Sequence, residues 1–278
     1  MRPHVLASGI VITLTLLGCF CSSPKSEPTR QVLHREPVVH VLFEERFNSP
    51  ELGLWNWTVT RKNGFETSTA EVVSTSKAED SGKLRLRCST MGTRPETVKY
   101  LGVVTKEALD ISGRKVLSLD FDWNDQANGC YLTAGIYLCP TFTRKNPRDE
   151  PTWLCFRYVG VPPGKNARAE SWICRKGRTR WVYDEGWPDE QRTGREIGKE
   201  HIEIHLNAGQ WTVFEDGKLL YDSGEKNRVS FSKAHLYVQV SSHSNYPARE
   251  VYFDNVVIRE KVRHPVKQNC LEKRTYNQ

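Results

Sequence analysis

The sequence predicts an all-β chain, folded as a two-sheet antiparallel β-sandwich. About a dozen short runs alternate apolar and polar side chains, and turn residues separate them, as in strands with one buried face. Asp216-Gly217 lies between two such runs, and Asp-Gly is a strong hairpin signal because both turn positions need positive φ. No convincing amphipathic helix and no internal repeat is present, which argues against a propeller or a β-solenoid.

Length and composition indicate one globular domain. The chain has 278 residues, 38% hydrophobic and 26% charged. About 235 residues remain beyond an N-terminal export and tether segment, a usual size for one β-sandwich domain. The formal net charge is +7, with basic and acidic residues interleaved. This pattern fits a solvated basic surface or attraction to polyanions such as acidic polysaccharide, and no motif supports nucleic-acid binding.

The N-terminus predicts export. Arg2 precedes an apolar stretch at 5–17 that is too short to span a bilayer. Leu16-Leu17-Gly18-Cys19 follows and resembles a bacterial lipobox. The resemblance implies cleavage before Cys19 and acylation of that residue, which gives stable membrane anchoring. The alternative is an ordinary secretory peptide cut near Cys21. We therefore expect a cell-envelope protein, periplasmic or surface-facing.

The rest of the chain divides into three parts after the signal peptide at 1–18. Residues 19–38 are rich in Ser, Pro, Lys and Glu and predict a flexible tether. The β-sandwich domain should span 39–262, and residues 263–278 form a polar, basic tail. The strands are expected within the ranges 39–60, 70–76, 83–90, 98–106, 116–125, 130–140, 152–159, 170–177, 179–187, 201–223, 234–242 and 251–260.

The stretch 201–223 should form three short strands. His201, Glu203 and His205 alternate with isoleucine and leucine, which predicts one polar and one buried face. A hairpin centred on Asp216-Gly217 would place Val213 opposite Leu220 and Phe214 opposite Leu219.

The cysteines allow several states in an exported protein. Their spacing does not resemble a zinc site. A hairpin about Pro163-Gly164 is expected to set Cys155 opposite Cys174, and a second hairpin would set Cys139 opposite Cys155. Only one of these disulfides could form, and we expect three unpaired, buried thiols instead.

Three motifs recur in order from Phe43 to Ile258: FEERF followed by Trp55, then WTVFEDGKLL, then VYFDNVVI. In this order they resemble the concanavalin A-like lectin/glucanase superfamily. The resemblance implies a jelly roll of two curved sheets with ligands on the concave one. Members include sugar-binding modules, glycoside hydrolases and polysaccharide lyases, and the fold alone does not choose among them.

Retaining hydrolases of this superfamily carry E-x-D-x-x-E or E-x-D-x-E on one strand, because the reaction needs a nucleophile and a proton donor. The nearest match is LSLDFDWND, in which Asp120 and Asp122 share a face. Ser118 stands where the first glutamate would be. The alternative is a pair of exposed aspartates on a solvated strand.

A polysaccharide lyase needs a base, a proton donor that is often tyrosine, and a cation that neutralises the uronate carboxylate. His235 and Tyr237 are the candidate base and donor, and Arg157 is the candidate cation. The motifs R-(S/T)-E-(L/V)-R, Q-(I/V)-H and YFKAGxYNQ of the lyases are absent. Other candidate ligand-binding residues on polar strand faces are Gln239, His201, Glu203, His205, Asp120 and Asp122.

No cofactor is required by these patterns, although a structural calcium ion is a candidate. Superfamily members often bind calcium near the chain ends through oxygen ligands, which suggests Asp254 with Glu44 or Glu45 here. The alternative is that Asp254 and Asn255 cap the backbone. His201 and His205 would lie about 13 Å apart on a strand, too far for simple chelation.

The eight tryptophans suggest sugar stacking. Trp123 and Trp211 share faces with apolar residues and should be core. Trp181 and Trp187 lie in a polar segment and are the candidates for an exposed platform. We therefore predict a monomeric, lipid-anchored protein that binds polysaccharide. A cavity lined by His235, Tyr237 and Arg157 would favour a lyase or hydrolase instead, and a filled face would favour a non-catalytic envelope scaffold.

Overall fold

The computed structural model describes residues 38–50, 57–61, 69–74, 82–88, 98–123, 132–144, 146–161, 166–186, 198–243 and 249–262. The predicted signal peptide, most of the predicted tether, the tail, Cys19 and Trp187 lie outside these residues. Among the described residues, none belongs to a helix that is long and apolar enough to cross a bilayer.

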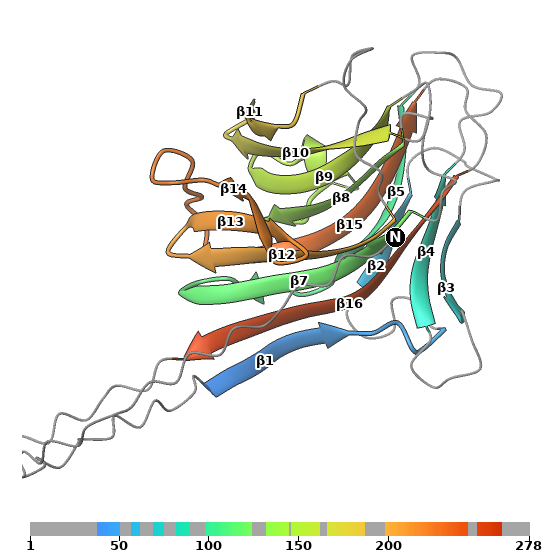
Figure 1. The fold of residues 1–278 in the computed structure, drawn as a ribbon, viewed down its shortest axis with the longest axis horizontal. Helices are drawn as coiled ribbons and strands as arrows, with labels where there is room; N and C mark the ends of the chain where they lie inside the picture. The colour runs from blue at the N-terminus through green and yellow to red at the C-terminus, as the bar shows by residue number, and fades with distance from the viewer. Residues whose placement is uncertain are drawn as a thin grey trace, which may run out of the picture. The chain divides into compact units, whose positions relative to one another are not determined.

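The described strands form two antiparallel sheets that pack face to face (Figure 1). Sheet I has the order β14 (Lys218–Asp222), β13 (Gln210–Glu215), β12 (Lys199–Asn207), β7 (Arg114–Asp122), β16 (Arg249–Val262), β4 (Gly82–Cys88) and β3 (Thr69–Ser74), and β1 (Val38–Glu45) also pairs with β16. Sheet II has the order β11 (Arg178–Asp184), β10 (Asn166–Arg175), β9 (Trp153–Val161), β8 (Thr133–Cys139), β15 (Lys233–His243), β5 (Val98–Thr105) and β2 (Trp57–Arg61), and β6 (Leu109–Asp110) also pairs with β15. The predicted two-sheet antiparallel sandwich is confirmed.

The core lies between the sheets because alternate residues of each strand point inward. In β12, Ile202 and Ile204 are buried, whereas His201 and Glu203 are partly exposed, as the alternation predicted. Aromatic rings meet at the centre: Phe121 of β7 packs edge-on against Tyr158 of β9, with ring centroids 5.3 Å apart. Such side chains each contribute roughly 1.5–3 kcal/mol on full burial.

The Asp216-Gly217 turn joins β13 to β14 as predicted, with φ of 48° and 77°. Phe214 lies opposite Leu219, which confirms half of the predicted register. The other half is wrong, because Val213 lies opposite Tyr221. A β-bulge at Leu220 shifts the pairing by one residue beyond that point.

The predicted cysteine pairings are wrong, although the strands do pair. Cys155 lies opposite Trp172 in the β9–β10 hairpin, and Tyr137, not Cys139, is its partner on β8. Both registers differ from the predicted ones by two residues. A hairpin centred on Pro163-Gly164, as predicted, sets Cys155 opposite Trp172 and not opposite Cys174. Cys139, Cys155 and Cys174 are buried and unpaired, as expected.

Candidate functional site

The outward face of sheet II gathers several predicted site residues into cross-strand rows. One row holds Trp172, Cys155, Tyr137, Tyr237 and Val104, and the next holds Glu170, Arg157, Gly135, Gln239 and Gly102. A Cβ on Gly135 would lie 2.6 Å from the Cβ of Arg157, so glycine leaves the room that the arginine occupies. His235 lies on the same face of β15 as Tyr237.

The β15 part of this face, which holds the candidate residues Tyr237 and Gln239, is filled by other side chains. Phe142 packs against Tyr237, with ring centroids 5.9 Å apart. The Tyr237 hydroxyl donates to the main-chain oxygen of Arg144 at 3.1 Å, and the Gln239 amide donates to Asn146 Oδ1 at 3.3 Å. Both Tyr237 and Gln239 are buried. Residues 140–144 and 146–152, which hold the 3-10 turn η1 (Pro147–Asp149) and which we call the covering segment, therefore cover β15.

A buried carboxylate organises this covering segment. Glu150 accepts hydrogen bonds from the Thr143 and Arg144 amides at 2.7 and 2.6 Å and from the Thr141 hydroxyl at 2.6 Å. It is almost fully buried. A buried carboxylate needs such donors, so Glu150 fixes the shape of the covering segment.

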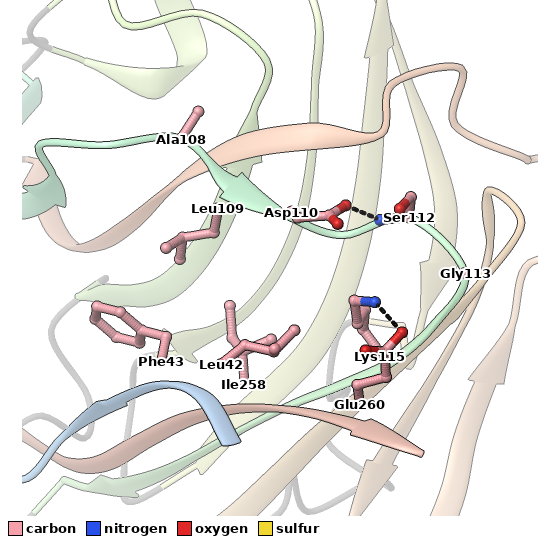
Figure 2. Close-up of a pocket in the computed structure, with 10 residues that line it drawn as sticks. All are labelled: Leu42, Phe43, Ala108, Leu109, Asp110, Ser112, Gly113, Lys115, Ile258 and Glu260. Carbon is pink, nitrogen blue, oxygen red and sulfur yellow. Dashed lines mark hydrogen bonds and ion pairs between the residues drawn. The ribbon is translucent and has the colours of Figure 1, made fainter. Parts of the chain in front are cut away.

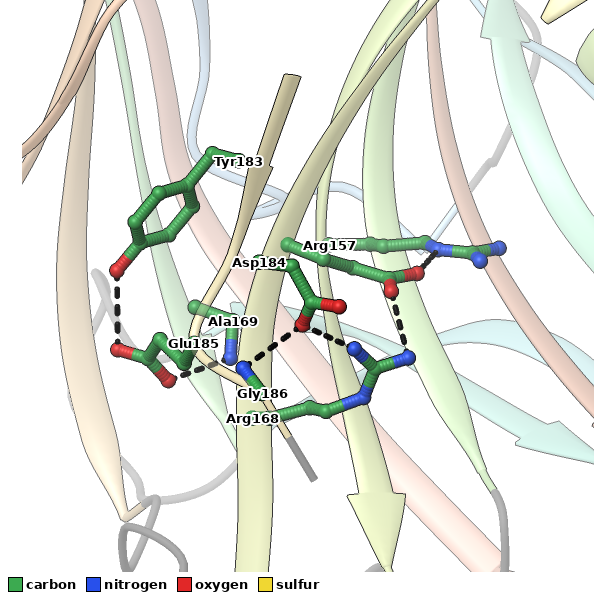
Figure 3. Close-up of polar contacts among 8 residues, drawn as sticks. Arg157, Arg168, Ala169, Tyr183, Asp184, Glu185 and Gly186 are labelled. Atoms are coloured by element: carbon green, nitrogen blue, oxygen red, sulfur yellow. Dashed lines mark hydrogen bonds and ion pairs between the residues drawn. The ribbon is translucent and has the colours of Figure 1, made fainter. Parts of the chain in front are cut away.

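Arg157 is engaged in an ion-pair chain across β9, β10 and β11 (Figure 3). Its side chain donates to Glu170, and the other Glu170 oxygen lies 2.8 Å from the Arg168 guanidinium. Arg168 in turn donates to Asp184. Glu170 and Arg168 are buried. Charges taken out of water must be paired, so Arg157 serves the fold and is not left for a ligand carboxylate.

A pair of tryptophans lies beside this chain, and we call Trp172 and Trp181 the tryptophan platform. Their ring centroids are 4.7 Å apart. The Arg157 guanidinium lies 5.3 Å from the Trp172 ring, and that of Arg168 lies 5.7 Å from the Trp181 ring. Trp181 is 47% exposed, as its polar sequence context predicted. Its indole is therefore both fixed and open to solvent.

A β-bulge gives Trp181 its orientation. Trp172 lies opposite Trp181 but Ser171 lies opposite Tyr183, so Val182 is the extra residue. Because of this extra residue, Trp181 lies opposite Trp172 and Asp184 lies opposite Glu170, and both of these β10 residues face outward. The end of β11 is fixed as well, because Glu185 accepts from the Ala169 amide at 2.7 Å and from the Tyr183 hydroxyl at 3.2 Å (Figure 3).

The outward face of sheet I brings other predicted residues together. His201 Nδ1 lies 2.6 Å from Asp120 Oδ1, and Asn255 donates to Asp120 Oδ2 at 2.7 Å. His205 Nε2 lies 2.8 Å from Glu203 Oε2. A pocket of about 200 Å³ lies where β7 ends and β12 begins and reaches residues of both faces of sheet I; it is lined by Lys83, Asp120, Phe121, Asp122, Lys199, Glu200, His201, Asp216 and Asp254.

Glu200 in this pocket was missed by the sequence patterns. Burial, a hydrogen bond to Asp216 and repulsion from Glu215 raise the pKa of Glu200 to about 7. The sequence did contain a signal for Glu200: it lies two residues before the buried Ile202, so the alternation of β12 places an acid on the inward-facing side. Burial also raises the pKa of Asp254. The pocket therefore holds a carboxyl that exchanges its proton near neutral pH.

The residues suggested for calcium do not fit a metal site as they lie. Glu44 pairs with Arg46 at 2.7 Å, and Glu45 accepts from the Phe47 amide at 2.7 Å. Asp254 accepts from the Asn255 amide at 2.7 Å, which is the capping alternative. Within the described ranges, no three His, Cys, Asp or Glu side chains lie close enough to hold a metal ion. Calcium binding stays a prediction.

A pocket of about 430 Å³ lies between β1, β6, β7 and β16 (Figure 2). Phe43, Leu42, Leu109 and Ile258 line its apolar part. At its other end the buried Lys115 pairs with Glu260 at 2.6 Å. The pocket therefore offers a ligand both apolar and polar surface, the latter including Asp110 and Ser112. It contains none of the predicted site residues.

A scan against protein-family models and a search of curated protein sequences both found no match. Solved structures do match. The chain resembles an endo-beta-1,3-glucanase from Pyrococcus furiosus with a TM-score of 0.55 at 12% identity, over 81% of this chain and 96% of that one. It also resembles the T. cruzi calreticulin globular domain with a TM-score of 0.53 at 19% identity, over 79% and 88% of the two chains.

A third likeness is to the catalytic domain of a laminarinase from Thermotoga petrophila, with a TM-score of 0.52 at 13% identity, over 82% of this chain and all of that one. At such identities the likeness shows the fold alone. The fold is the concanavalin A-like jelly roll that the three sequence motifs predicted.

Proposed function

We propose that the protein binds polysaccharide without cleaving it, on the outward face of sheet II, and that it is exported and lipid-anchored through Cys19. One observation carries the binding proposal: Trp181 is 47% exposed and yet held by Trp172 and Arg168. Sugar rings stack on exposed aromatic faces beside polar groups that fix the hydroxyls. A ring fixed before binding loses little conformational entropy on binding. The N-terminal pattern supports the export part of the proposal.

The lyase alternative is weakened by what surrounds its candidate residues. Arg157 is paired with Glu170, so its charge is already neutralised. Tyr237 is fully buried and donates to a main-chain oxygen, and burial raises the pKa of its hydroxyl far above the ordinary range. A lyase needs both groups at a substrate carboxylate and leaving oxygen. The covering segment occupies that space.

The scaffold alternative would require a face that is filled throughout. The β15 part is filled, but β11 presents residues 178–181 exposed, with Trp181 among them. This exposed end of sheet II favours a binding module over a scaffold.

A glycoside hydrolase remains a second candidate, because of the raised pKa of Glu200. A carboxyl near pKa 7, in a pocket that Asp120 and Asp122 also line, has the pKa of a general acid. This candidate predicts that the wild type releases reducing ends from a polysaccharide and that Glu200→Gln does not. No release across a broad panel would exclude it.

The binding proposal is tested by comparing wild type with Trp181→Ala in retention and calorimetry on a panel of neutral and acidic polysaccharides. Removal of a central aromatic contact should weaken binding about tenfold or more. Trp181→Phe should keep part of the affinity. Leu219→Ala is the matched control, because Leu219 is also an exposed apolar residue on an edge strand. Equal affinities of wild type and Trp181→Ala would contradict the assigned site.

A further inference from the structure

The turn of the β10–β11 hairpin, next to the tryptophan platform, carries a dense group of cations. Arg175 and Arg178 lie directly opposite each other across the two strands. The connection between β14 and β15 adds two more basic residues. Together these form what we call the basic end, whose members are all exposed: Arg175, Lys176, Arg178, Arg180, Lys226 and Arg228.

Neutral groups hold the basic end together. The Arg175 guanidinium donates to the main-chain oxygens of Lys226, at 3.4 Å, and Arg228. Arg180 donates to Asn227 Oδ1. Asn227 is itself fixed, because its amide donates to the Tyr221 hydroxyl at 3.0 Å. Because carbonyl and amide oxygens carry no net charge, the positive charge of these two arginines is not cancelled.

Arg178 itself adds no evident stability. Like charges directly opposite each other in a sheet are unfavourable, and Arg178 lies opposite Arg175. Among the described residues, Arg178 has no ion pair, and Arg228 pairs only with the exposed Glu225, at 2.8 Å. An exposed pair of this kind contributes little. Two like charges that face each other without a gain in stability mark a candidate functional surface.

The basic end and the tryptophan platform share one strand. Arg178 and Trp181 are three residues apart on β11, about 10 Å along the strand, and this odd spacing places their side chains on opposite faces of the strand. β11 is the edge strand of the path through sheet II. An extended chain of sugars that crosses this edge could therefore reach the indole on one face and the cations on the other.

We propose, resting on the proposed function, that the polysaccharide is a polyanion. One of its sugar rings stacks on Trp181, and carboxylate or sulfate groups of other sugars in the same chain meet the basic end. Clustered cations raise the local concentration of a polyanion and speed its association. The interaction is between exposed charges, so added salt screens it.

The test uses a triple variant, Lys176→Gln, Arg178→Gln and Lys226→Gln, whose replaced side chains make no hydrogen bond or ion pair in the described part of the chain. The control variant is Lys106→Gln, Lys218→Gln and Lys233→Gln, which removes the same charge from exposed positions elsewhere. Both should unfold at the wild-type temperature. The probes are polygalacturonate for carboxylates, dextran sulfate for sulfates, a neutral β-1,3-glucan, and a short DNA duplex, each titrated at several salt concentrations.

We expect the wild type to bind at least one of the two polyanionic glycans about tenfold or more tightly than the neutral glucan, and less tightly as salt rises. The triple variant should lose about tenfold in that affinity, with a shallower salt dependence, and the control variant should not. Which of the two probes binds identifies the anionic group.

Equal binding of charged and neutral glycans, unaffected in the triple variant, would overturn the inference and leave the proposed function standing. Binding of no glycan by the wild type would overturn both, and tighter binding of the duplex than of either glycan would overturn the inference in favour of a nucleic-acid surface.

Discussion

The exposure of Trp181 follows from the polar sequence around it, whereas its fixed orientation follows from contacts with residues of another strand. The polar segment around it predicted exposure, because a run of charged residues on an edge strand does not enter a core. Its contact with the Arg168 guanidinium depends on the β10–β11 register and on the extra residue Val182. Neither is visible in a window of sequence, so the exposed ring was predictable and its fixed orientation was not.

Glu200 leads to a prediction at the same scale. Its pKa in the folded protein is about 7, against an ordinary 4.5 for the unfolded chain. Between these values the folded state holds a proton that the unfolded chain has released. Its contribution to stability is thus complete below pH 4.5 and is lost as pH rises toward 7. Glu200→Gln removes this contribution to the pH dependence.

The measurement is the urea midpoint of wild type and Glu200→Gln at several pH values from 4.5 to 8. The wild type should lose stability relative to the variant as pH rises across this range. Because Asp254 titrates in both proteins, the difference between the curves isolates Glu200. Parallel curves would show that Glu200 keeps an ordinary pKa.

At the scale of elements, the β13–β14 hairpin shows what local sequence determines. Asp216-Gly217 fixes where the chain reverses, and the alternation of β12 fixes its buried face. The bulge at Leu220 has no such signature, and it moved half of the predicted register. The packing of the covering segment on β15 is a contact between segments far apart in sequence. For that reason alternation made Tyr237 and Gln239 look solvated when they are buried.

Gly217 of this hairpin and Gly198, which precedes β12, give a matched pair of glycine substitutions. Nothing lies within 4 Å of a Cβ added at Gly217 or at Gly198, but only Gly217 has a positive φ, of 77°. Gly217→Ala should therefore cost about 1–2 kcal/mol through backbone strain. Gly198→Ala should stay within about 0.5 kcal/mol of wild type or be more stable. Denaturant unfolding measures both, and equal effects would mean that the turn conformation is different.

At the scale of the whole molecule, the chain forms the predicted jelly roll although it is only 12% identical to the Pyrococcus furiosus glucanase that it resembles. Many sequences satisfy this fold because it requires alternation and turns and few specific residues. The function is therefore argued from the outward face of sheet II. The tryptophan platform lies on that face, and the basic end lies along the same edge strand.

The packing of sheet II also predicts thiol behaviour. Cys139 and Cys155 are buried, and burial raises the pKa of both thiols, that of Cys155 to about 12. Thiolates are the reactive form, so iodoacetamide should leave both unmodified in the native protein and modify them in denaturant, as read by peptide mass spectrometry. A disulfide joining two of Cys139, Cys155 and Cys174 would contradict the strand register.

The central claim is that a polysaccharide stacks on Trp181. Its most direct test is the set of indole N–H signals in a two-dimensional NMR spectrum, with the Trp181 signal assigned from Trp181→Phe, during titration with a polysaccharide that the protein retains. The Trp181 signal should shift with ligand concentration and saturate with the dissociation constant found by calorimetry, while the signal of Trp123, which is fully buried in the core, stays in place. Binding seen by calorimetry with an unmoved Trp181 signal would contradict the claim.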